Sequence, residues 1–359
     1  MGLNCNGKWR VGDIPHGKRN LITDVEGVSV GHCTIADGDI QTGVTAILPH
    51  QGDLFHDKVM AASHVINGFG KSVGLVQVDE LGTLETPVLL TNTLGVGTAS
   101  TALVRWMLRR NDDIGDTTGT VNPVVCECND GYLNDIRGLH VHEEDVFAAL
   151  SDCRPDFAEG AVGAGRGMCC HGLKGGIGSS SRLVELDGKT FVVGALVLTN
   201  FGRLDDLVVV HDPIGCRIAR WLDAHGEGMA EELLKQKDAG SVITIIATDV
   251  PLSERQLKRV AKRAAVGLSR TGSYVSNGSG EIVIAFSSAN HVPHYAPRNI
   301  LHFDMVDDNA IDGVFRATAD AVEESVLSSL FHAKTVVGRN GRIRWGLSEL
   351  MGRMGERMT

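Results

Sequence analysis

Short apolar runs, each bounded by turn residues, recur along the chain and predict buried β-strands. Their hydrophobicity is continuous rather than alternating, so we expect both faces of the resulting sheets to be covered. The runs occupy residues 43–49, 87–92, 121–128, 191–200, 242–247 and 281–286.

Apolar positions at helical spacing predict helices between these strands, and the clearest case is residues 253–270. Leu257, Val260 and Leu268 share one stripe there, and Ser253 with Gln256 forms a capping-box pattern. Strands that alternate with helices indicate a layered α/β protein. Further helices are predicted at residues 99–110, 143–150 and 319–334.

The composition is that of an ordinary globular protein and indicates one domain over residues 1–359. Of the 359 residues 43% are hydrophobic, and no repeat or proline-rich linker divides them. No apolar run reaches the length of a membrane span, and the polar start does not match a cleaved signal peptide. The eight cysteines lack a disulfide framework spacing, which favours reduced thiols and a cytoplasmic location.

The charge balance argues against nucleic acid as a partner. The net charge is −10, so non-specific binding to phosphates is disfavoured. Residues 253–270 are locally basic, but their cationic side chains fall opposite the apolar stripe. We interpret them as a solvated helix face.

Three other motifs are weak candidates for chemistry. "GVSVG" around Ser29 matches a nucleophile elbow, but no helical pattern follows it. The glycine-rich run 160–182 lacks nucleotide-binding spacing and predicts tight turns and close packing. His140 and His142 could share a strand face as metal ligands, but we interpret them as solvated loop residues and predict no metal centre.

Ser241 lies where a polar loop, "KDAG", meets a buried strand. A serine hydroxyl needs a neighbouring base to become a nucleophile, and no histidine lies nearby in the sequence. Cleavage of the Gly240–Ser241 bond would create an α-amine on the carbon that carries the hydroxyl. With a reference pKa near 8, about a tenth of such amines are unprotonated at pH 7. Gly-Ser before an apolar strand is also common as a plain turn.

A second pair of polar residues supports the catalytic interpretation. Ser279 and Glu281 are two residues apart, hence on one face, at the start of the strand 281–286. If this strand runs parallel to the one that follows Ser241, with the basic helix between them, the three residues meet at one edge. Ligands of open parallel sheets bind at the opposite ends of strands, so a sheet sandwich fits this site better.

With these residues in view, the chain resembles the L-aminopeptidase/D-esterase family, which includes the β-peptidyl aminopeptidases. Members are N-terminal-nucleophile-like serine hydrolases that cut themselves into two chains. The resemblance runs through ordered blocks over most of the length: "GVSVGH" (27–32), "TGVTAILPH" (42–50), "HVINGFGKSVGLVQVDELGTLETPVLLTNT" (64–93), "NDGYLNDIRG" (129–138), "GLKGGIGSSSR" (172–182), "NFG" (200–202), "GSVITIIATDVPLSERQLKRVAKRAAVGLSRTGS" (240–273) and "GSGEIVIAF" (278–286).

The resemblance implies a layered α-β-β-α sandwich and a role for several residues. Cleavage between Gly240 and Ser241 would give an α chain of residues 1–240 and a β chain of residues 241–359, with Ser241 as nucleophile. Ser279 and Glu281 would hydrogen-bond the new amine and the hydroxyl. Asn200 would donate to the oxyanion, and Tyr132 would line the site. By local sequence, Asn200 also fits a turn and Tyr132 a packing role.

The same resemblance implies a substrate class and an assembly. We expect a metal-independent and cofactor-free hydrolase of small peptides, amides or esters. Its expected partners are such substrates and further copies of the chain in a homotetramer. Glu127 and Asp130 are the candidates for binding the substrate ammonium, and both also fit solvated loop acids. Cys169, Cys170 and His171 have no role assigned by the resemblance. An ornithine-type acetyltransferase and a non-catalytic ligand-binding protein are the alternatives.

Overall fold

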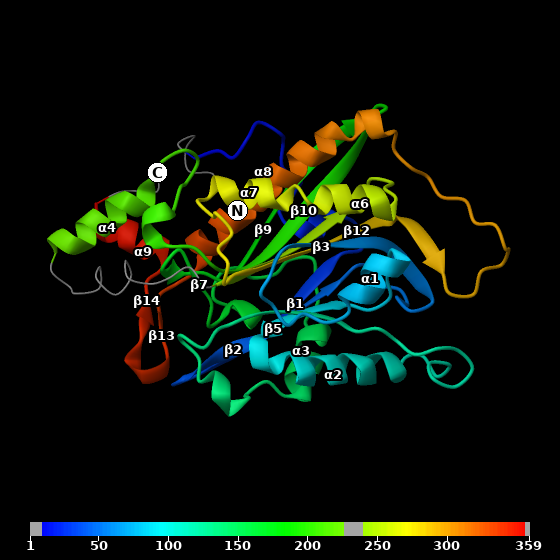
Figure 1. Cartoon of the computed structure of the whole chain (residues 1–359), viewed down its shortest axis with the longest axis horizontal. Helices are drawn as coiled ribbons and strands as arrows, with labels where there is room; N and C mark the ends of the chain where they lie inside the picture. The colour runs from blue at the N-terminus through cyan, green and yellow to red at the C-terminus, as the bar shows by residue number, and fades with distance from the viewer. Residues whose placement is uncertain (1–8, 226–239, 356–359) are drawn as a thin grey trace.

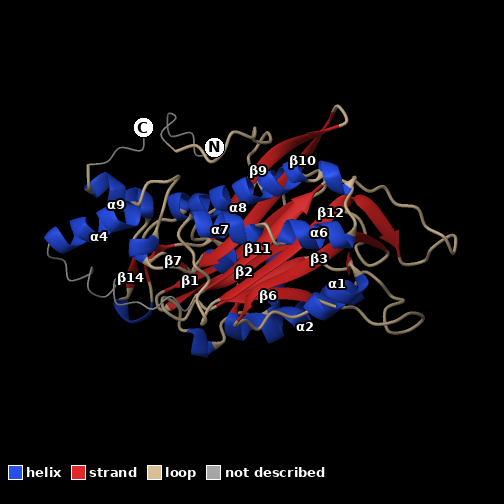
Figure 2. Ribbon diagram, turned by 45° about the horizontal axis from the view of Figure 1, so that its top comes forward, coloured by secondary structure: helices blue, strands red, loops and turns tan. Residues whose placement is uncertain are grey.

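The computed structural model describes residues 9–225 and 240–355, and it has four layers. Two β-sheets pack face to face, and helices cover the outer face of each (Figures 1 and 2). The predicted α-β-β-α sandwich is confirmed. The start of the chain with Cys5, the segment 226–239 before the predicted cleavage point, and residues 356–359 lie outside the described residues.

The first sheet has four strands and the second has six. Adjacent strands run antiparallel except β5 with β6 and β11 with β12. The first sheet has the order β1 (Ser29–Asp37), β2 (Ile40–Leu48), β5 (Val88–Asn92), β6 (Val124–Cys128). The second has the order β4 (Thr83–Leu84), β3 (Asp57–Gly68), β12 (Gly280–Pro293), β11 (Ser241–Thr248), β10 (Lys189–Asn200), β9 (Ile177–Leu186). Two short hairpins are formed by β7 (Cys169–Cys170) with β8 (Leu173–Lys174) and by β13 (Val336–Val337) with β14 (Ile343–Arg344).

Helices of the two outer layers come from different parts of the chain. The first sheet is covered by α2 (Val96–Leu108) and α3 (Glu143–Ser151), and the second by α6 (Glu254–Ala261), α7 (Ala264–Arg270) and α8 (Asp312–His332). The remaining helices are α1 (Leu75–Leu81), α4 (Ile214–Ala224) and α9 (Leu347–Arg353). None of the described helices combines the length and the hydrophobicity needed to cross a lipid bilayer.

The apolar residues form separate layers that follow the alternation of side chains along the strands. On β11, Ile243 and Ile245 point between the two sheets, whereas Val242 and Ile246 point toward the helices. Both faces of β11 are therefore buried, which explains its continuous hydrophobicity. Helices cover one face of β11, and the other sheet covers its inner face.

All six predicted strands are present with shifted ends, but β1, β3 and β9 were not predicted. β9 contains Ser179, Ser180 and Arg182, which are buried although they are polar. Their partners come from distant segments, as when Arg182 donates a 2.5 Å hydrogen bond to Glu324 of α8. A hydrophobic pattern cannot indicate a strand whose burial depends on such partners.

The predicted basic helix 253–270 is two helices, because the helical conformation is interrupted between α6 and α7 at residues 262–263. Its capping box is present: Gln256 N–H donates to Ser253 Oγ at 3.3 Å, and Ser253 N–H donates to Gln256 Oε1 at 3.2 Å. Four of its cations pair with acids: Lys258 with Asp79, Arg255 and Arg259 with Asp308, and Arg270 with Asp320.

Candidate active site

Three strand ends meet at Ser241, the first residue of β11. Ser241 pairs with Asn200, the last residue of the antiparallel strand β10, and with Gly280, the first residue of the parallel strand β12. The β11 and β12 strands are connected through α6 and α7, so the predicted parallel β-α-β unit is observed. Ser241 and Asn200 point between the two sheets, because paired residues share a face.

Gly240 packs so closely against β10 that no side chain fits. A Cβ at this position would lie 1.8 Å from the carbonyl oxygen of Asn200. The Gly240 carbonyl accepts a 3.2 Å hydrogen bond from the N–H of Gly280. The carbonyl of the predicted scissile bond is thus held in a defined orientation and polarised by a backbone donor.

The Ser241 hydroxyl lies over Gly280. A Cβ at Gly280 would be 3.1 Å from Ser241 Oγ and 2.7 Å from the carbonyl oxygen of Phe69. Any larger residue at position 280 would press against both the hydroxyl and the backbone of Phe69. Glycine therefore keeps the space around the hydroxyl open.

Ser279 and Glu281 flank Gly280, and both are buried. The Ser279 hydroxyl donates a hydrogen bond to Glu281 Oε1. The segment before them is held by Asn67 of β3, whose side-chain amide donates to the carbonyls of Ser279 and, at 3.0 Å, Ser276. The role of Asn67 was missed, because the pairing of β3 with β12 is not evident from local sequence.

The side-chain amide of Asn200 is oriented by two backbone groups. Its Oδ1 accepts from the N–H of Cys169 at 2.9 Å, which identifies the other end of the amide as nitrogen. Its Nδ2 donates to the carbonyl of Asn129 at 2.9 Å. An amide nitrogen carries two hydrogens, so the second is available to a further acceptor. Cys169 thus acquires a role through its backbone.

Lys174 secures the glycine-rich loop that contains Cys169. Its fully buried ammonium donates to the carbonyls of Gly165, Met168 and Gly175 at 2.9, 2.6 and 2.7 Å. Burial lowers the pKa of Lys174 to about 7. The predicted close packing of this run is present too, since a Cβ at Gly178 would lie 2.0 Å from a carbonyl oxygen of α8.

Tyr132 is half-buried beside this loop. Its hydroxyl accepts a 2.6 Å hydrogen bond from Arg344, whose guanidinium also lies 3.6 Å from the centre of the ring. The predicted role of Tyr132 in lining the site is compatible with these contacts and stays a prediction.

Glu127 and Asp130, the candidate ammonium ligands, are both buried. Glu127 Oε1 accepts from the N–H of Lys71 at 2.8 Å, and its Oε2 accepts from the hydroxyl of Thr93. Asp130 Oδ1 accepts from the side chain of Asn134 at 3.0 Å. The expectation that either acid is a solvated loop residue is wrong. Their binding role stays a prediction, and Asp130 is the more enclosed of the two.

Asp130 has an unusual titration that predicts a pH effect on stability. Burial raises its pKa from 3.8 to about 7. Between these values the unfolded chain is ionised while the native state retains the proton, so the contribution of Asp130 to stability falls as pH rises from about 4 to 7. The loss amounts to at most about 4 kcal/mol. Asp130→Asn should remove it, and the gap between the two free energies of unfolding should change with pH.

Urea unfolding at several pH values between about 4.5 and 6 would measure this gap. The Ser241→Ala background is used because it is expected to keep the chain whole, and Asp156→Asn, at a side chain that is 82% exposed, is the control. Curves that stay parallel for Asp130→Asn and its parent would contradict the assignment. In the active enzyme, a raised KM for Asp130→Asn would instead indicate that Asp130 binds the ammonium.

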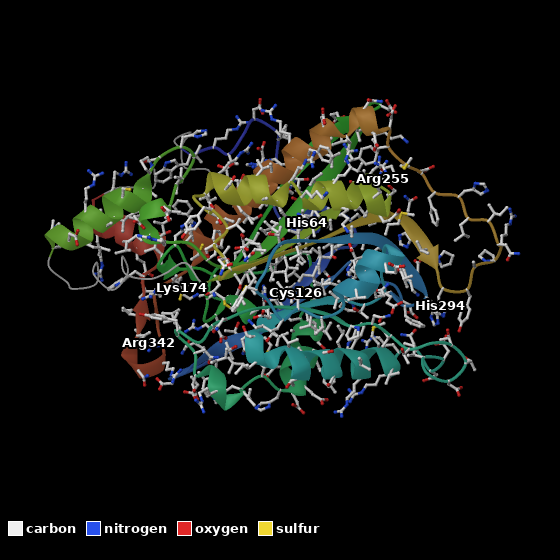
Figure 3. All side chains as sticks on the ribbon, in the orientation of Figure 1. His64, Cys126, Lys174, Arg255, His294 and Arg342 are labelled. Atoms are coloured by element: carbon white, nitrogen blue, oxygen red, sulfur yellow. The ribbon has the colours of Figure 1, made fainter. Side chains whose placement is uncertain are left out.

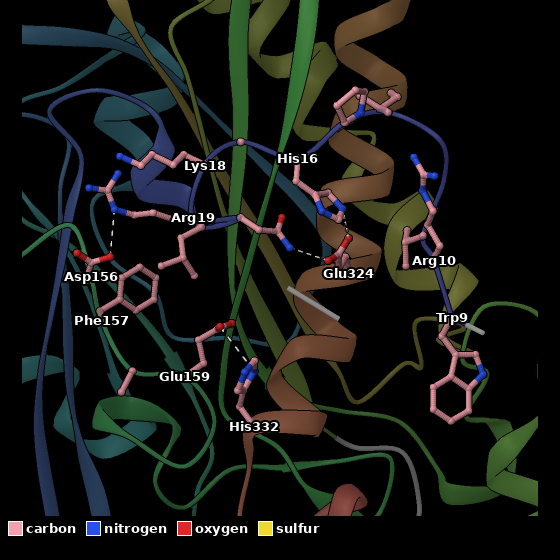
Figure 4. A pocket seen from close by; sticks show the side chains of 17 residues that line it. Trp9, Arg10, His16, Lys18, Arg19, Asp156, Phe157, Glu159, Glu324 and His332 are labelled. Atoms are coloured by element: carbon pink, nitrogen blue, oxygen red, sulfur yellow. Dashed lines mark hydrogen bonds and ion pairs between the residues drawn. The ribbon is translucent and has the colours of Figure 1, made fainter. Parts of the chain in front are cut away.

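The residues of the other candidate motifs take part in the fold and not in the site around Ser241. Ser29 begins β1 and its hydroxyl accepts from Gln51 at 2.8 Å, so no strand-turn-helix elbow forms. His140 pairs with Asp135 at 3.4 Å, and His142 precedes α3. A cavity of about 1140 Å³ lies beneath the segment 9–21 (Figure 4). It is lined by none of the candidate site residues Ser241, Asn200, Ser279 and Glu281.

Comparisons with known proteins agree with this geometry. The family model described as "Peptidase family S58" matches residues 20–344. A β-peptidyl aminopeptidase, BapA of Sphingosinicella microcystinivorans, is 38% identical over 339 residues, which cover 90% of this chain and 84% of that protein.

Two solved structures are similar over nearly the whole chain. A protein from Pyrococcus horikoshii OT3 superposes with a TM-score of 0.90 at 48% identity, covering 99% of this chain and 100% of that one. The L-aminopeptidase D-Ala-esterase/amidase of Ochrobactrum anthropi, described as a prototype of the serine aminopeptidases and a variant of the Ntn hydrolase fold, has a TM-score of 0.84 at 37% identity, with 96% and 97% covered. The chain therefore belongs to peptidase family S58.

Proposed function

We propose that this protein is a self-processing serine aminopeptidase that also hydrolyses small amides and esters. The observation that supports this most directly is the position of Ser241. It starts a buried strand, follows a glycine that has no room for a side chain, and has Asn200 and Gly280 as its two strand neighbours. The relatives named as aminopeptidases and esterases support the same activity.

In the processing step, Ser241 Oγ attacks the carbonyl carbon of Gly240. The C–N bond to Ser241 breaks, an ester forms between Gly240 and the serine oxygen, and the departing nitrogen takes up the hydroxyl proton. Water then hydrolyses the ester, which leaves a carboxylate on Gly240 and a free hydroxyl and amine on Ser241. The hydrogen bond from Gly280 N–H to the Gly240 carbonyl supports this step, because it stabilises the charge that develops on the oxygen.

In turnover, the new α-amine accepts the hydroxyl proton as Oγ attacks the substrate carbonyl. The Asn200 amide donates to the oxyanion, the leaving group departs with the proton, and water releases the acyl group from Ser241. An amine with a reference pKa near 8 is a far better base at pH 7 than a lysine near 10.4.

The Ser279–Glu281 pair would act on the amine. Side chains alternate along a strand, so the pair stands on the other side of β12 from the face that Ser241 Oγ shares with Gly280. The Ser241 nitrogen lies between these faces, in the plane of the sheet. A buried carboxylate on that side would hold the amine in place and stabilise its protonated form.

The substrate would present its ammonium to Glu127, whose buried carboxylate borders Gly70, next to Phe69 in the Ser241 neighbourhood. Two broader properties are part of the proposal. A cytoplasmic location is supported by the seven described cysteines, all of which are free. A homotetramer is supported by the family resemblance, and light scattering of the purified protein would test it.

N-terminal sequencing of the smaller fragment tests the proposal most directly. The expected result is a sequence starting Ser-Val-Ile-Thr, from Ser241 onward, in preparations that release N-terminal residues from peptide amides. A different start, or active enzyme with one unbroken chain, would overturn it. An acetyltransferase would instead transfer an acetyl group to an amine, and both the peptidase family match and the serine at 241 favour hydrolysis.

A further inference from the structure

Two histidines and an aspartate meet at the end of the sandwich that is remote from Ser241. One ligand atom from each of His50, Asp57 and His291 lies within 4.8 Å of the others. Among residues 9–225 and 240–355, these three are the His, Cys, Asp and Glu side chains whose spacing could hold a metal ion. His294, which closely follows His291, lies at the opposite end of the molecule from Lys174 (Figure 3).

The fold brings the three residues together from both sheets. His50 follows β2 of the first sheet, Asp57 begins β3, and His291 lies near the end of β12. The pairing of β12 with β3 shifts here: Ser287 pairs with Met60 but His291 pairs with Val59, so residues 288–290 form a bulge. Such bulges re-aim side chains. This one places His291 diagonally across from Asp57 on one face.

Existing hydrogen bonds orient the ligand atoms. His50 Nδ1 accepts from the N–H of Gly52 at 3.0 Å, so the ring carries its proton on Nε2, which donates to the carbonyl of Asp57 at 2.8 Å. A histidine that ligates a metal commonly donates its other N–H to a carbonyl in this way. Gly52 is exposed in a bend, so its N–H can bond to water instead and leave the unprotonated His50 nitrogen to a metal ion.

The other two ligands already face each other. His291 Nδ1 and Asp57 Oδ2 are 2.7 Å apart, and the rings of His50 and His291 have centroids 5.2 Å apart. Zinc bonds of about 2.1 Å place tetrahedral ligand atoms roughly 3.4 Å apart. The group therefore needs only side-chain adjustment to enclose an ion.

Neighbouring histidines differ in their contacts. Both ring nitrogens of His56 bond to carboxylates, Asp53 at 2.7 Å and Asp113 at 2.8 Å. Both nitrogens of this ring are therefore already engaged by side chains outside the group. His294 is engaged with Lys58 and Thr118.

We propose that His50, Asp57 and His291 form a binding site for a divalent transition-metal ion of the zinc class, with water completing the coordination. Two imidazoles and a carboxylate are ligands that such ions prefer. The ion ties the end of β2 in one sheet to β3 and β12 in the other. Its role is to stabilise the fold, and it takes no part in hydrolysis at Ser241.

Titration of untagged, chelator-treated full-length protein with Co²⁺ tests the site, because tetrahedral Co²⁺ absorbs visible light. We expect one equivalent to bind and Zn²⁺ to displace it. His50→Ala, Asp57→Asn and His291→Ala should each weaken binding at least about 10-fold. The control His302→Ala removes an exposed histidine outside the group and should bind as the parent does.

Zn²⁺ should also raise the unfolding temperature of the parent by a few degrees but not that of His291→Ala, because a ligand stabilises only the state that binds it. His291 is exposed, so its alanine variant should fold normally and retain full peptidase activity. Unaltered binding in Asp57→Asn and His291→Ala, or no saturable 1:1 binding below about 100 µM metal, would overturn the site. These outcomes are independent of whether Ser241 is the nucleophile.

Discussion

Ser241→Ala is expected to remain a single chain with kcat/KM at least about 10⁴-fold lower than that of the wild-type enzyme. The same hydroxyl attacks the Gly240 carbonyl and the substrate, so one substitution should remove both reactions. Denaturing gels would show whether fragments 1–240 and 241–359 form, and release of N-terminal residues from a peptide amide would report activity.

Ser287→Ala is the matched control for this experiment. Ser287 is a buried serine on β12 of the same sheet, and its hydroxyl donates to the carbonyl of Val250 at 2.7 Å. Losing that bond should cost about 1 kcal/mol of stability and leave processing and activity intact. Normal processing in Ser241→Ala would refute the proposed nucleophile. Unchanged function would favour a non-catalytic binding protein.

Asn200→Asp is expected to lower kcat by about 10²–10³-fold and to change KM little. Aspartate has the size of asparagine and can still accept from the N–H of Cys169. It replaces the proposed oxyanion donor, Nδ2, with a second oxygen, so the charge expected to develop in the transition state would lose its partner. Steady-state kinetics with an amide substrate would measure the effect.

Asn290→Asp provides a closely matched comparison. The Asn290 amide is also bracketed by backbone, since it donates to the carbonyl of Asp304 at 2.8 Å and accepts from its N–H at 3.1 Å. Asn200 and Asn290 are 9% and 7% exposed, so an added carboxylate is buried to a similar degree. Both variants should lose stability, but only Asn200→Asp should lose kcat. A kcat within about threefold of the wild type would argue against an oxyanion role.

Several strands could be predicted because their own residues are apolar enough to indicate burial. Residues 242–247 are apolar without a break, and the structure covers both faces of that strand. β3 could not be recognised in this way, since it ends in polar residues and glycine at the site. The contribution of Asn67 comes from its hydrogen bonds to the backbone of Ser276 and Ser279, in the segment that leads into β12.

Some features of the candidate site could likewise be predicted from the sequence, and others could not. Ser241, Ser279 and Glu281 could be singled out from the sequence, because polar residues directly before buried strands are conspicuous. The backbone support of Asn200 from Cys169 and Asn129 could not, because those contacts join segments that are distant along the chain. The metal-ligand group depends even more on folding, since its members come from both sheets and one follows a bulge.

The amino-acid sequence by itself determined that six segments are buried strands, that the chain is a layered α/β protein, and that a serine lies at the start of one of these strands. These properties depend on hydrophobic periodicity and on neighbours a few residues away. Only the tertiary structure decided that β10 ends beside Ser241, that Lys174 secures the loop behind Asn200, and that His50 meets His291. Each of those depends on strand order, on register and on the burial of polar partners. These features arise only when distant segments pack together, and local sequence patterns do not encode them.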